Sequence, residues 1–286
     1  MNIIIPKHSG FCYGVKRSVA VAYTLAGQEN VYMYGQIVHN PSVVRDLQNS
    51  GLTLIQDLSE IPTGTKNAKI LIRAHGVPPA VPEAAAARGF EIIDMTCPHV
   101  KKIHTLVTEA SGRGLDVMVC GTPGHPETEG TLGRVETRAF LVQDLAEARR
   151  VAASTEFSPQ GLCLVAQTTH KKQAYDEIRA FLAGQVDVPF APHMTICEAT
   201  ASRQEELRAL AKAADACIIV GGANSSNVTK LYEIARACCP RTQHIESVAQ
   251  LDVSLLEKAE TVVIAGGAST PEASVREVAR KVSSVI

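Results

Sequence analysis

Three cysteines occupy the same kind of position in this 286-residue chain. Cys97 follows the apolar run 90–93 and precedes Pro98, a residue that can open a helix, and Cys12 and Cys197 stand at similar junctions. The three are 85 and 100 residues apart (97−12 and 197−97). A thiol at a helix N-terminus loses its proton readily, because unpaired N–H groups and the helix dipole favour the thiolate. The junctions therefore predict metal ligands or nucleophiles.

The spacing of these cysteines bears on what they would hold. Zinc sites usually contain ligand pairs at C-x₂₋₄-C spacing, whereas these three are isolated, one in each third of the chain. Three thiolates can hold an iron–sulfur cubane and leave one iron open to a substrate oxygen. Spacing alone leaves three interpretations open: an iron–sulfur cluster, redox-active thiols and structural thiols.

The other five cysteines have a structural interpretation. Cys120, Cys163 and Cys217 lie in apolar runs and are predicted to be small hydrophobic residues of buried strands. The pair Cys238-Cys239 closes a predicted helix and matches neither a zinc nor a cluster spacing.

Short apolar runs alternate along the chain with helical stretches. Runs that are apolar on both faces and separated by helices predict parallel sheets with helices on either side, which is the α/β class. Glycines at 51 and 89 are expected to end helices over 41–50 and 79–88. The predicted strands are Asn2–Ile5, Val31–Tyr34, Ile70–Ile72, Phe90–Ile93, Leu115–Val119, Leu162–Ala166, Ala216–Val220 and Val262–Ala265.

Polar residues follow these strands, at the ends where ligands bind in parallel sheets. A single histidine there is more often a loop residue than a ligand, but several polar segments together with three cysteines predict one functional site. The segments contain His39, His75, His125 with Glu127, Gln167-Thr168-Thr169, Gly221 to Asn227 and Gly266 to Thr270.

Two of these segments suggest an anion site. Each has paired glycines, which let backbone N–H groups approach a ligand, and the polar residues that follow are expected in the first turn of a helix. The alternative for either segment is that its Ser and Asn merely cap a helix. A nucleotide P-loop is disfavoured because the Gly-Lys-Ser/Thr ending is absent. With three histidines as further donors, a diphosphate fits better than a carboxylate.

Composition narrows the function classes. Hydrophobic residues make up 45% and charged residues 20%, which is typical of a soluble globular protein, and no run of 18 apolar residues could span a membrane. The N-terminal residues lack a secretion signal, so a cytoplasmic location is expected. A net charge of −1 and the lack of a basic cluster argue against nucleic acid as a partner.

The segments resemble the IspH/LytB family of 4-hydroxy-3-methylbut-2-enyl diphosphate reductases over nearly the whole chain. The resemblance rests on Gly10-Phe11-Cys12, Gly14-Val15, His39-Asn40, Ala74-His75-Gly76-Val77, Thr96-Cys97-Pro98, His125-Pro126-Glu127, Gln167-Thr168-Thr169, Thr195-Ile196-Cys197, Ala199-Thr200, Arg203-Gln204, Asn224-Ser225-Ser226-Asn227 and Ala268-Ser269-Thr270-Pro271.

The resemblance implies three pseudo-symmetric α/β lobes with mainly parallel sheets, arranged as a trefoil around a central cluster. The lobes would span residues 14–97, residues 98–195, and residues 196–286 together with 1–13. Cys12, Cys97 and Cys197 would hold one 4Fe-4S cluster per chain, with the fourth iron open to the substrate hydroxyl.

The family also implies roles for the strand-end residues. The catalytic residues would be Glu127, Thr168 and His125, and the substrate would be bound by His39, His75, His125, Thr168, Ser225, Ser226, Asn227 and Ser269. The expected reaction is the reductive dehydroxylation of an allylic diphosphate to isopentenyl and dimethylallyl diphosphates, the last step of the methylerythritol phosphate route to isoprenoids. Ferredoxin or flavodoxin would supply electrons.

Two rival functions stay open on the residues alone. A non-redox hydro-lyase could use the same open iron and would need a base but no electron donor. A cluster-bearing redox sensor would need a surface for its partner and would not need the diphosphate residues. Glu127 itself could be no more than a first-turn helix residue, where a carboxylate complements the dipole.

Overall fold

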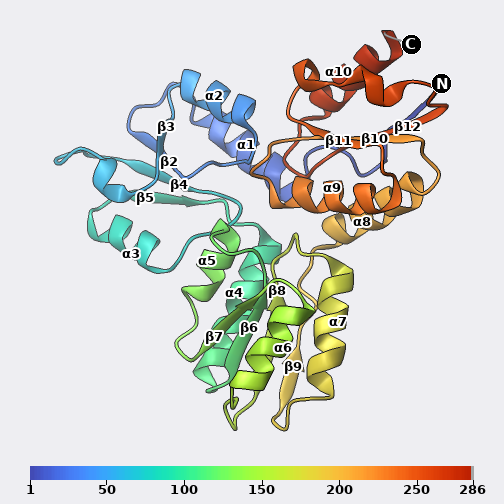
Figure 1. Ribbon diagram of the computed structural model, residues 1–286. Coiled ribbons are helices and arrows are strands. Elements are labelled where there is room, and N and C mark those ends of the chain that lie inside the picture. The colour runs from blue at the N-terminus through green and yellow to red at the C-terminus, as the bar shows by residue number, and fades with distance from the viewer. Residues whose placement is uncertain (285–286) are drawn as a thin grey trace. The chain divides into compact units, whose positions relative to one another are not determined.

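A computed structural model describes residues 1–284 of the chain, which divides into two compact units (Figure 1). One unit comprises Met1–Lys16, Val38–Val44 and the chain from Glu198 onward, and we call it unit 1. The other, unit 2, comprises Arg17–Ile37 and Arg45–Cys197.

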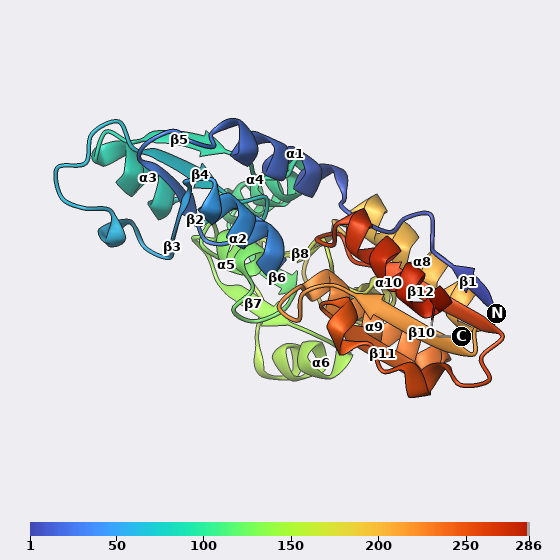
Figure 2. The same cartoon turned by 90° about the horizontal axis from the view of Figure 1, so that it is seen from above.

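Each of the three sheets has four parallel strands connected in the same order. Unit 2 contains the sheets β3-β2-β4-β5 and β7-β6-β8-β9, and unit 1 contains β11-β10-β12-β1. In both sheets of unit 2 the first strand in sequence is internal, the second pairs outside it, and the third and fourth follow on its other side; β10, β11 and β12 take the first three of these places in unit 1. In unit 1 the fourth place is taken by β1, which lies beside β12 (Figure 2). The predicted α/β class with three lobes of parallel sheets is confirmed; the lobe boundaries stay a prediction.

The strands are short. They are β1 (Asn2–Ile4), β2 (Val31–Tyr34), β3 (Thr53–Ile55), β4 (Lys69–Ile72), β5 (Glu91–Asp94), β6 (Asp116–Cys120), β7 (Ala139–Val142), β8 (Leu162–Ala166), β9 (Phe190–Pro192), β10 (Ala216–Val220), β11 (Thr242–Ile245) and β12 (Thr261–Gly266). The helices are α1 (Tyr13–Thr24), α2 (Pro41–Asn49), α3 (Ala80–Ala87), α4 (Pro98–Gly112), α5 (Pro126–Leu132), α6 (Leu145–Ser154), α7 (Lys172–Ala183), α8 (Glu198–Ala211), α9 (Ser226–Cys238) and α10 (Glu272–Ser284).

The sheet of unit 1 is buried on both faces. Alternate residues of β10 point to opposite sides, so Ile218 packs in one apolar cluster with Val275 and Val278 of α10. Ile219 packs in another cluster with Leu207 of α8 and with residues of α9. The helices accordingly flank the sheet, α10 on one side and α8 and α9 on the other (Figure 1). This two-sided burial explains why the inner strands are continuous apolar runs.

Unit 2 is built in the same way. The sheet around β6 and β8 packs Ile103 and Val107 of α4 on one face and Tyr175 and Ile178 of α7 on the other. The sheet around β2 and β4 packs against α3 and the short 3₁₀ turn at 58–60. Two further 3₁₀ turns, at 248–250 and 253–256, lie in unit 1.

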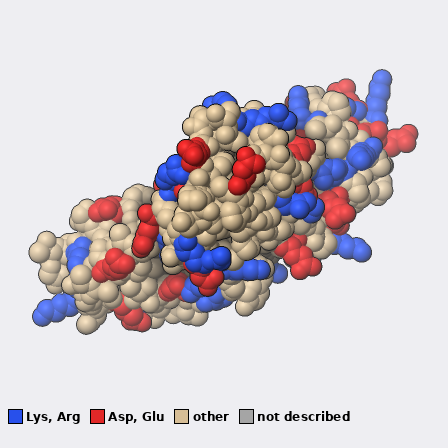
Figure 3. All heavy atoms as spheres, turned by 90° about the horizontal axis from the view of Figure 1, so that it is seen from below, with Lys and Arg blue, Asp and Glu red and all other residues tan. Residues whose placement is uncertain are grey.

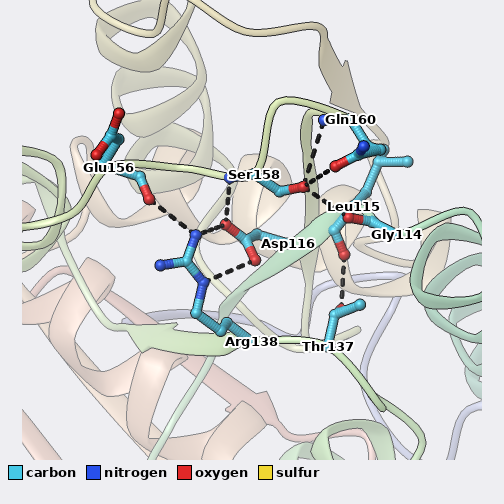
Figure 4. A network of polar contacts seen from close by, with 8 residues as sticks. All are labelled: Gly114, Leu115, Asp116, Thr137, Arg138, Glu156, Ser158 and Gln160. Carbon is cyan, nitrogen blue, oxygen red and sulfur yellow. Dashed lines mark hydrogen bonds and ion pairs between the residues drawn. The ribbon is translucent and has the colours of Figure 1, made fainter.

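An ion pair between the buried Asp116 and the exposed Arg138 fixes the amino end of β6. Asp116 is 2% exposed, and its carboxylate accepts hydrogen bonds from Arg138 Nε at 3.1 Å and Nη2 at 2.7 Å (Figure 4). The Ser158 N–H donates to the same carboxylate at 2.8 Å. A buried carboxylate with both oxygens paired avoids the cost of an isolated charge. This end of the sheet is thus structural, whereas the polar loops follow the carboxyl ends of the strands.

The surface carries charges of both signs. On the face drawn in Figure 3, acidic and basic side chains are interspersed. Among the described residues, no helix combines the length and the apolar character that a membrane span requires.

Candidate functional site

The three cysteines of interest each directly precede a helix. Cys97 is the N-cap of α4, with Pro98 in the first turn, and its carbonyl accepts the Lys101 N–H at 2.9 Å. The Cys12 carbonyl accepts the Lys16 N–H of α1, also at 2.9 Å. Cys197 immediately precedes α8. The predicted strand-to-helix junctions are therefore present at all three positions.

The three junctions also share one backbone hydrogen bond. The N–H of Cys12 donates to the Ala268 carbonyl at 3.1 Å, that of Cys97 to Ala74 at 3.0 Å, and that of Cys197 to Thr168 at 3.2 Å. Each cysteine follows an edge strand: β1, β5 or β9. Each acceptor follows the neighbouring strand of the same sheet: β12, β4 or β8. The three positions are structurally equivalent, each at the carboxyl edge of its own sheet.

The cysteines inside strands have a different environment. Cys120, Cys163 and Cys217 are buried, and burial raises the pKa of their thiols to about 12, about 11 and about 12. Those thiols stay protonated and unreactive. Cys12, Cys97 and Cys197 are only partly buried. Cys238 ends α9 and Cys239 caps it, as the sequence predicts.

Unit 2 brings together two of the predicted histidines. The rings of His75 and His125 lie edge to face with centroids 5.4 Å apart. His125 is buried and is the N-cap of α5, where its Nδ1 accepts the Glu127 N–H at 3.1 Å. That bond places the hydrogen of a neutral His125 ring on Nε2, which can donate to an anion.

Glu127 and Thr168 form the second predicted group of unit 2. The Glu127 side chain is 1% exposed, and its carboxylate accepts the Thr168 N–H at 2.5 Å and the Thr168 hydroxyl at 2.7 Å. Burial raises the pKa of Glu127 to about 7, although the two hydrogen bonds from Thr168 oppose the shift. A carboxyl group with such a pKa holds a proton near neutral pH and can donate it.

Thr168 connects this carboxyl group to a cysteine junction. Its carbonyl accepts the Cys197 N–H while its hydroxyl and N–H reach Glu127. The loop after β8 is held in turn by Gln167, whose Oε1 accepts the Thr122 N–H at 2.9 Å. The sequence places Gln167 in a polar strand-end segment but does not predict a specific role for it.

Unit 1 contains the serine and asparagine residues that the sequence predicts to bind an anion. Ser225 is the N-cap of α9, and Ser226 and Asn227 begin that helix. Asn227 is 3% exposed; its Oδ1 accepts the Ala268 N–H at 2.9 Å, but its Nδ2 has no hydrogen-bond partner. A buried amide donor without a partner costs free energy unless a ligand accepts from it. Ser269, which is 5% exposed, follows Ala268 in the same loop.

The position of Ser269 differs from the prediction. It does not stand in the first turn of a helix, since α10 begins only at Glu272. Thr270 closes a turn instead, with its N–H donating to the Gly267 carbonyl at 3.0 Å and its hydroxyl to the Val220 carbonyl at 2.8 Å. Pro271 then starts the approach to the helix.

His39 lies beside the glycine pair of the same unit. A Cβ built on Gly222 would approach the His39 carbonyl oxygen to 2.7 Å, so only glycine permits this contact. Asn40, the next residue, accepts the Val43 N–H at 3.2 Å and so caps α2. His39 is thereby held next to the loop that leads to Ser225.

Comparison with known proteins agrees with the sequence resemblance. The family model described as LytB protein matches residues 3–283. The chain is similar to the 4-hydroxy-3-methylbut-2-enyl diphosphate reductase of Caldanaerobacter subterraneus subsp. tengcongensis, with 35% identity covering 100% of this chain and 98% of the relative. It is also similar to the enzyme of that name from Geobacter sp. (strain M21), with 37% identity over the same shares of both chains.

Two solved structures share the fold over almost the whole chain. One is an (E)-4-hydroxy-3-methyl-but-2-enyl diphosphate reductase described as the terminal enzyme of the non-mevalonate pathway, at 34% identity and a TM-score of 0.67, covering 99% of both chains. The other is the E-1-hydroxy-2-methyl-but-2-enyl-4-diphosphate reductase from Plasmodium falciparum, at 26% identity and a TM-score of 0.89, covering 98% of this chain and 87% of that one.

Proposed function

The chain belongs to the LytB family of 4-hydroxy-3-methylbut-2-enyl diphosphate reductases, and on that premise we propose which of its residues carry out the reaction and how. The protein is an oxidoreductase of isoprenoid biosynthesis that reductively dehydroxylates (E)-4-hydroxy-3-methylbut-2-enyl diphosphate to isopentenyl and dimethylallyl diphosphates. The C–O bond breaks, the hydroxyl leaves as water after taking a proton, and two electrons with a second proton form the new C–H bond.

The observation that best supports our assignment is the contact of Glu127 with Thr168. The buried Glu127 carboxyl, with a pKa of about 7, and the Thr168 hydroxyl 2.7 Å from it form a short path for a proton. The carbonyl of the same threonine accepts the Cys197 N–H. We assign Glu127 as the proton donor to the departing hydroxyl, with Thr168 orienting it and His125 beside it.

Cys12, Cys97 and Cys197 fit a cluster. All three are partly buried thiols at equivalent junctions, and three soft ligands suit an iron–sulfur cluster better than a hard cation. We assign one 4Fe-4S cluster per chain to them. When bound, such a cluster with its fourth iron open supplies a Lewis acid for the substrate hydroxyl and the electrons of the reduction.

We assign the diphosphate to the polar residues of the strand ends. The orphaned Asn227 Nδ2 supports this, because it offers a buried donor that an anion oxygen would satisfy. The N-cap of α9 adds the partial positive charge of a helix N-terminus. The assigned residues are His39, His75, His125, Thr168, Ser225, Ser226, Asn227 and Ser269.

The electron source and the location stay predictions. Ferredoxin or flavodoxin is the expected donor, and the expected location is the cytoplasm. The reductase requires a reductant, and the rival hydro-lyase does not. The test is therefore anaerobic turnover of the allylic diphosphate, measured with and without dithionite and a viologen. Products that form only with reductant support the reductase; turnover without reductant favours a hydro-lyase, and no turnover with a cluster present favours a sensor.

A further inference from the structure

Helix α5 lies directly against the loop that carries His75, with glycines at the contact. A Cβ built on Gly130 would lie 3.3 Å from the Val77 backbone nitrogen, and one on Gly133 would lie 2.9 Å from the Pro78 Cβ. A side chain at either position would crowd the loop, so the end of the helix and the loop pack closely at these two glycines. His125 and Glu127 stand at the start of the same helix.

Arg134 joins the two segments next to these glycines. Its Nη1 donates to the Val77 carbonyl of the loop at 2.8 Å and also to the Gly130 carbonyl of α5. Hydrogen bonds from a charged guanidinium are stronger than neutral ones, and its planar geometry fixes the direction of each. One side chain therefore sets the position of residues 76–78 against α5.

The other side of the loop is closed by His104 of α4. Gly76 has a φ of +74°, and a Cβ there would lie 2.7 Å from His104 Cε1. His104 is 7% exposed and its Nε2 has no hydrogen-bond partner. Burial and the nearby Arg134 charge lower the pKa of His104 to about 4. Its ring is therefore uncharged near pH 7 and packs against the loop. The loop is thus held between α4 and α5.

We propose that Arg134 is a positioning residue that holds the loop 75–78 against α5 and so sets His75 beside His125 for anion binding. His75 follows β4 and His125 follows β6, two strands of different sheets, so neither sheet fixes the separation of the two rings. The packing of α5 on the loop fixes that separation. The proposal rests on the assignment of the two histidines to the diphosphate. Arg134 Nη1 donates to the backbone carbonyls of Val77 and Gly130, which is why we give this residue a positioning and not a binding role.

The test is calorimetric binding of inorganic diphosphate to the anaerobically purified full chain. Arg134→Ala should weaken binding about tenfold, the lower end of the loss seen at metal sites when a residue that orients a metal-binding side chain is removed. Arg138→Ala is the matched control: it removes a structural arginine of the same lobe, at the Asp116 end of β6 (Figure 4). Both variants should lower the melting temperature, but only Arg134→Ala should change the affinity.

A double substitution separates positioning from a direct effect of charge. If Arg134 acts through His75, Arg134→Ala should have little further effect in a His75→Ala background. Additive losses would overturn the proposal, as would equal affinities for the two arginine variants. If His75→Ala alone leaves diphosphate binding unchanged, the assigned function of His75 is wrong and the positioning role falls with it.

Gly133→Ala tests the same geometry without changing a charge, should Arg134→Ala fail to fold. The added methyl group must displace Pro78, so diphosphate binding should weaken while the net charge is constant. Gly112→Ala, at the end of α4 where a Cβ meets nothing within 4 Å, is its control and should bind like the wild type. Wild-type affinity in Gly133→Ala would contradict the proposal.

Discussion

The backbone N–H of Cys197 donates to the carbonyl of Thr168 at 3.2 Å, and the hydroxyl of the same threonine donates to the Glu127 carboxylate at 2.7 Å. One residue thus contacts both a proposed cluster ligand and the proposed proton donor. A shift of the loop after β8 would move both together, so we expect proton delivery and ligand geometry to be sensitive to the same changes.

Glu127→Gln should abolish most of the turnover. The amide keeps the shape, and its oxygen can accept the Thr168 N–H while its Nε2 donates to the Thr168 hydroxyl, but it cannot donate a proton that it then recovers. Since positioned acid catalysis contributes about 10²–10⁴-fold, kcat should fall by that factor, while cluster content and substrate affinity stay near wild type. Steady-state kinetics under anaerobic conditions measure this.

Glu129→Gln is the control for that substitution. Glu129 lies in the same helix but is exposed, so it should behave like the wild type. A Glu127→Gln enzyme that retains more than about a tenth of the wild-type rate would remove the proton-donor role.

Activity should depend on pH through Glu127. Its pKa of about 7 means that the carboxyl is protonated below that pH and loses its donor proton above it. We therefore expect kcat to decline as pH rises through about 7, and the residual activity of Glu127→Gln to lack this decline. An alkaline limb that persists unchanged in the variant would assign the titration to another group.

Stability should change with pH for the same reason. Because the folded-state pKa lies above the ordinary value of 4.5, the folded protein binds more protons than the unfolded chain between pH 4.5 and about 7. The free energy of unfolding should therefore fall as pH rises through this window, by at most roughly 3 kcal/mol from Glu127. Urea unfolding at several pH values would measure the slope. If the free energy of unfolding of Glu127→Gln falls with pH as steeply as that of the wild type, Glu127 is not the group that titrates.

The anion residues make a prediction about Asn227. Asn227→Asp keeps an oxygen for the Ala268 N–H but replaces the unpartnered Nδ2 donor with a negative charge. Affinity for inorganic diphosphate should fall by roughly 1.5–3 kcal/mol or more, the value of a charge-assisted hydrogen bond. Asn224→Asp adds the same charge at an exposed position of the loop that precedes α9 and should have a much smaller effect. Equal losses in both would indicate long-range repulsion and not a lost donor.

The inner strands of each sheet could be predicted from the sequence, but most outer strands could not. β2, β8 and β10 have the predicted bounds, because strands covered on both faces are continuous apolar runs. β11, with the sequence Thr-Gln-His-Ile, and β9, which ends in proline, are partly exposed edge strands and lack that pattern. Nor does any local pattern show that β1 pairs with β12, some 260 residues away.

The candidate site shows a similar division. The position of the cysteines and histidines at strand ends could be predicted from the apolar runs that precede them, and their roles as ligands stay a prediction. The contact of Glu127 with Thr168, 41 residues apart, needed the structure. Arg134 had no sequence signal, because it binds the carbonyl of Val77, 57 residues away, and every residue has a carbonyl. A contact to a backbone carbonyl cannot be predicted from the type of the residue that carries that carbonyl.

The central claim is that three cysteines at equivalent junctions hold the cluster that this reductase uses. Anaerobic iron and sulfide analysis of single Cys→Ser variants, with reductant-dependent turnover measured on the same samples, tests it most directly. We predict about four iron and four sulfide per wild-type chain, and loss of cluster and turnover on substituting Cys12, Cys97 or Cys197, because a hydroxyl is a poor replacement for a thiolate on iron. Cys120→Ser, Cys163→Ser and Cys217→Ser should keep both and lose only stability. A strand cysteine as necessary as the three junction cysteines would contradict the account.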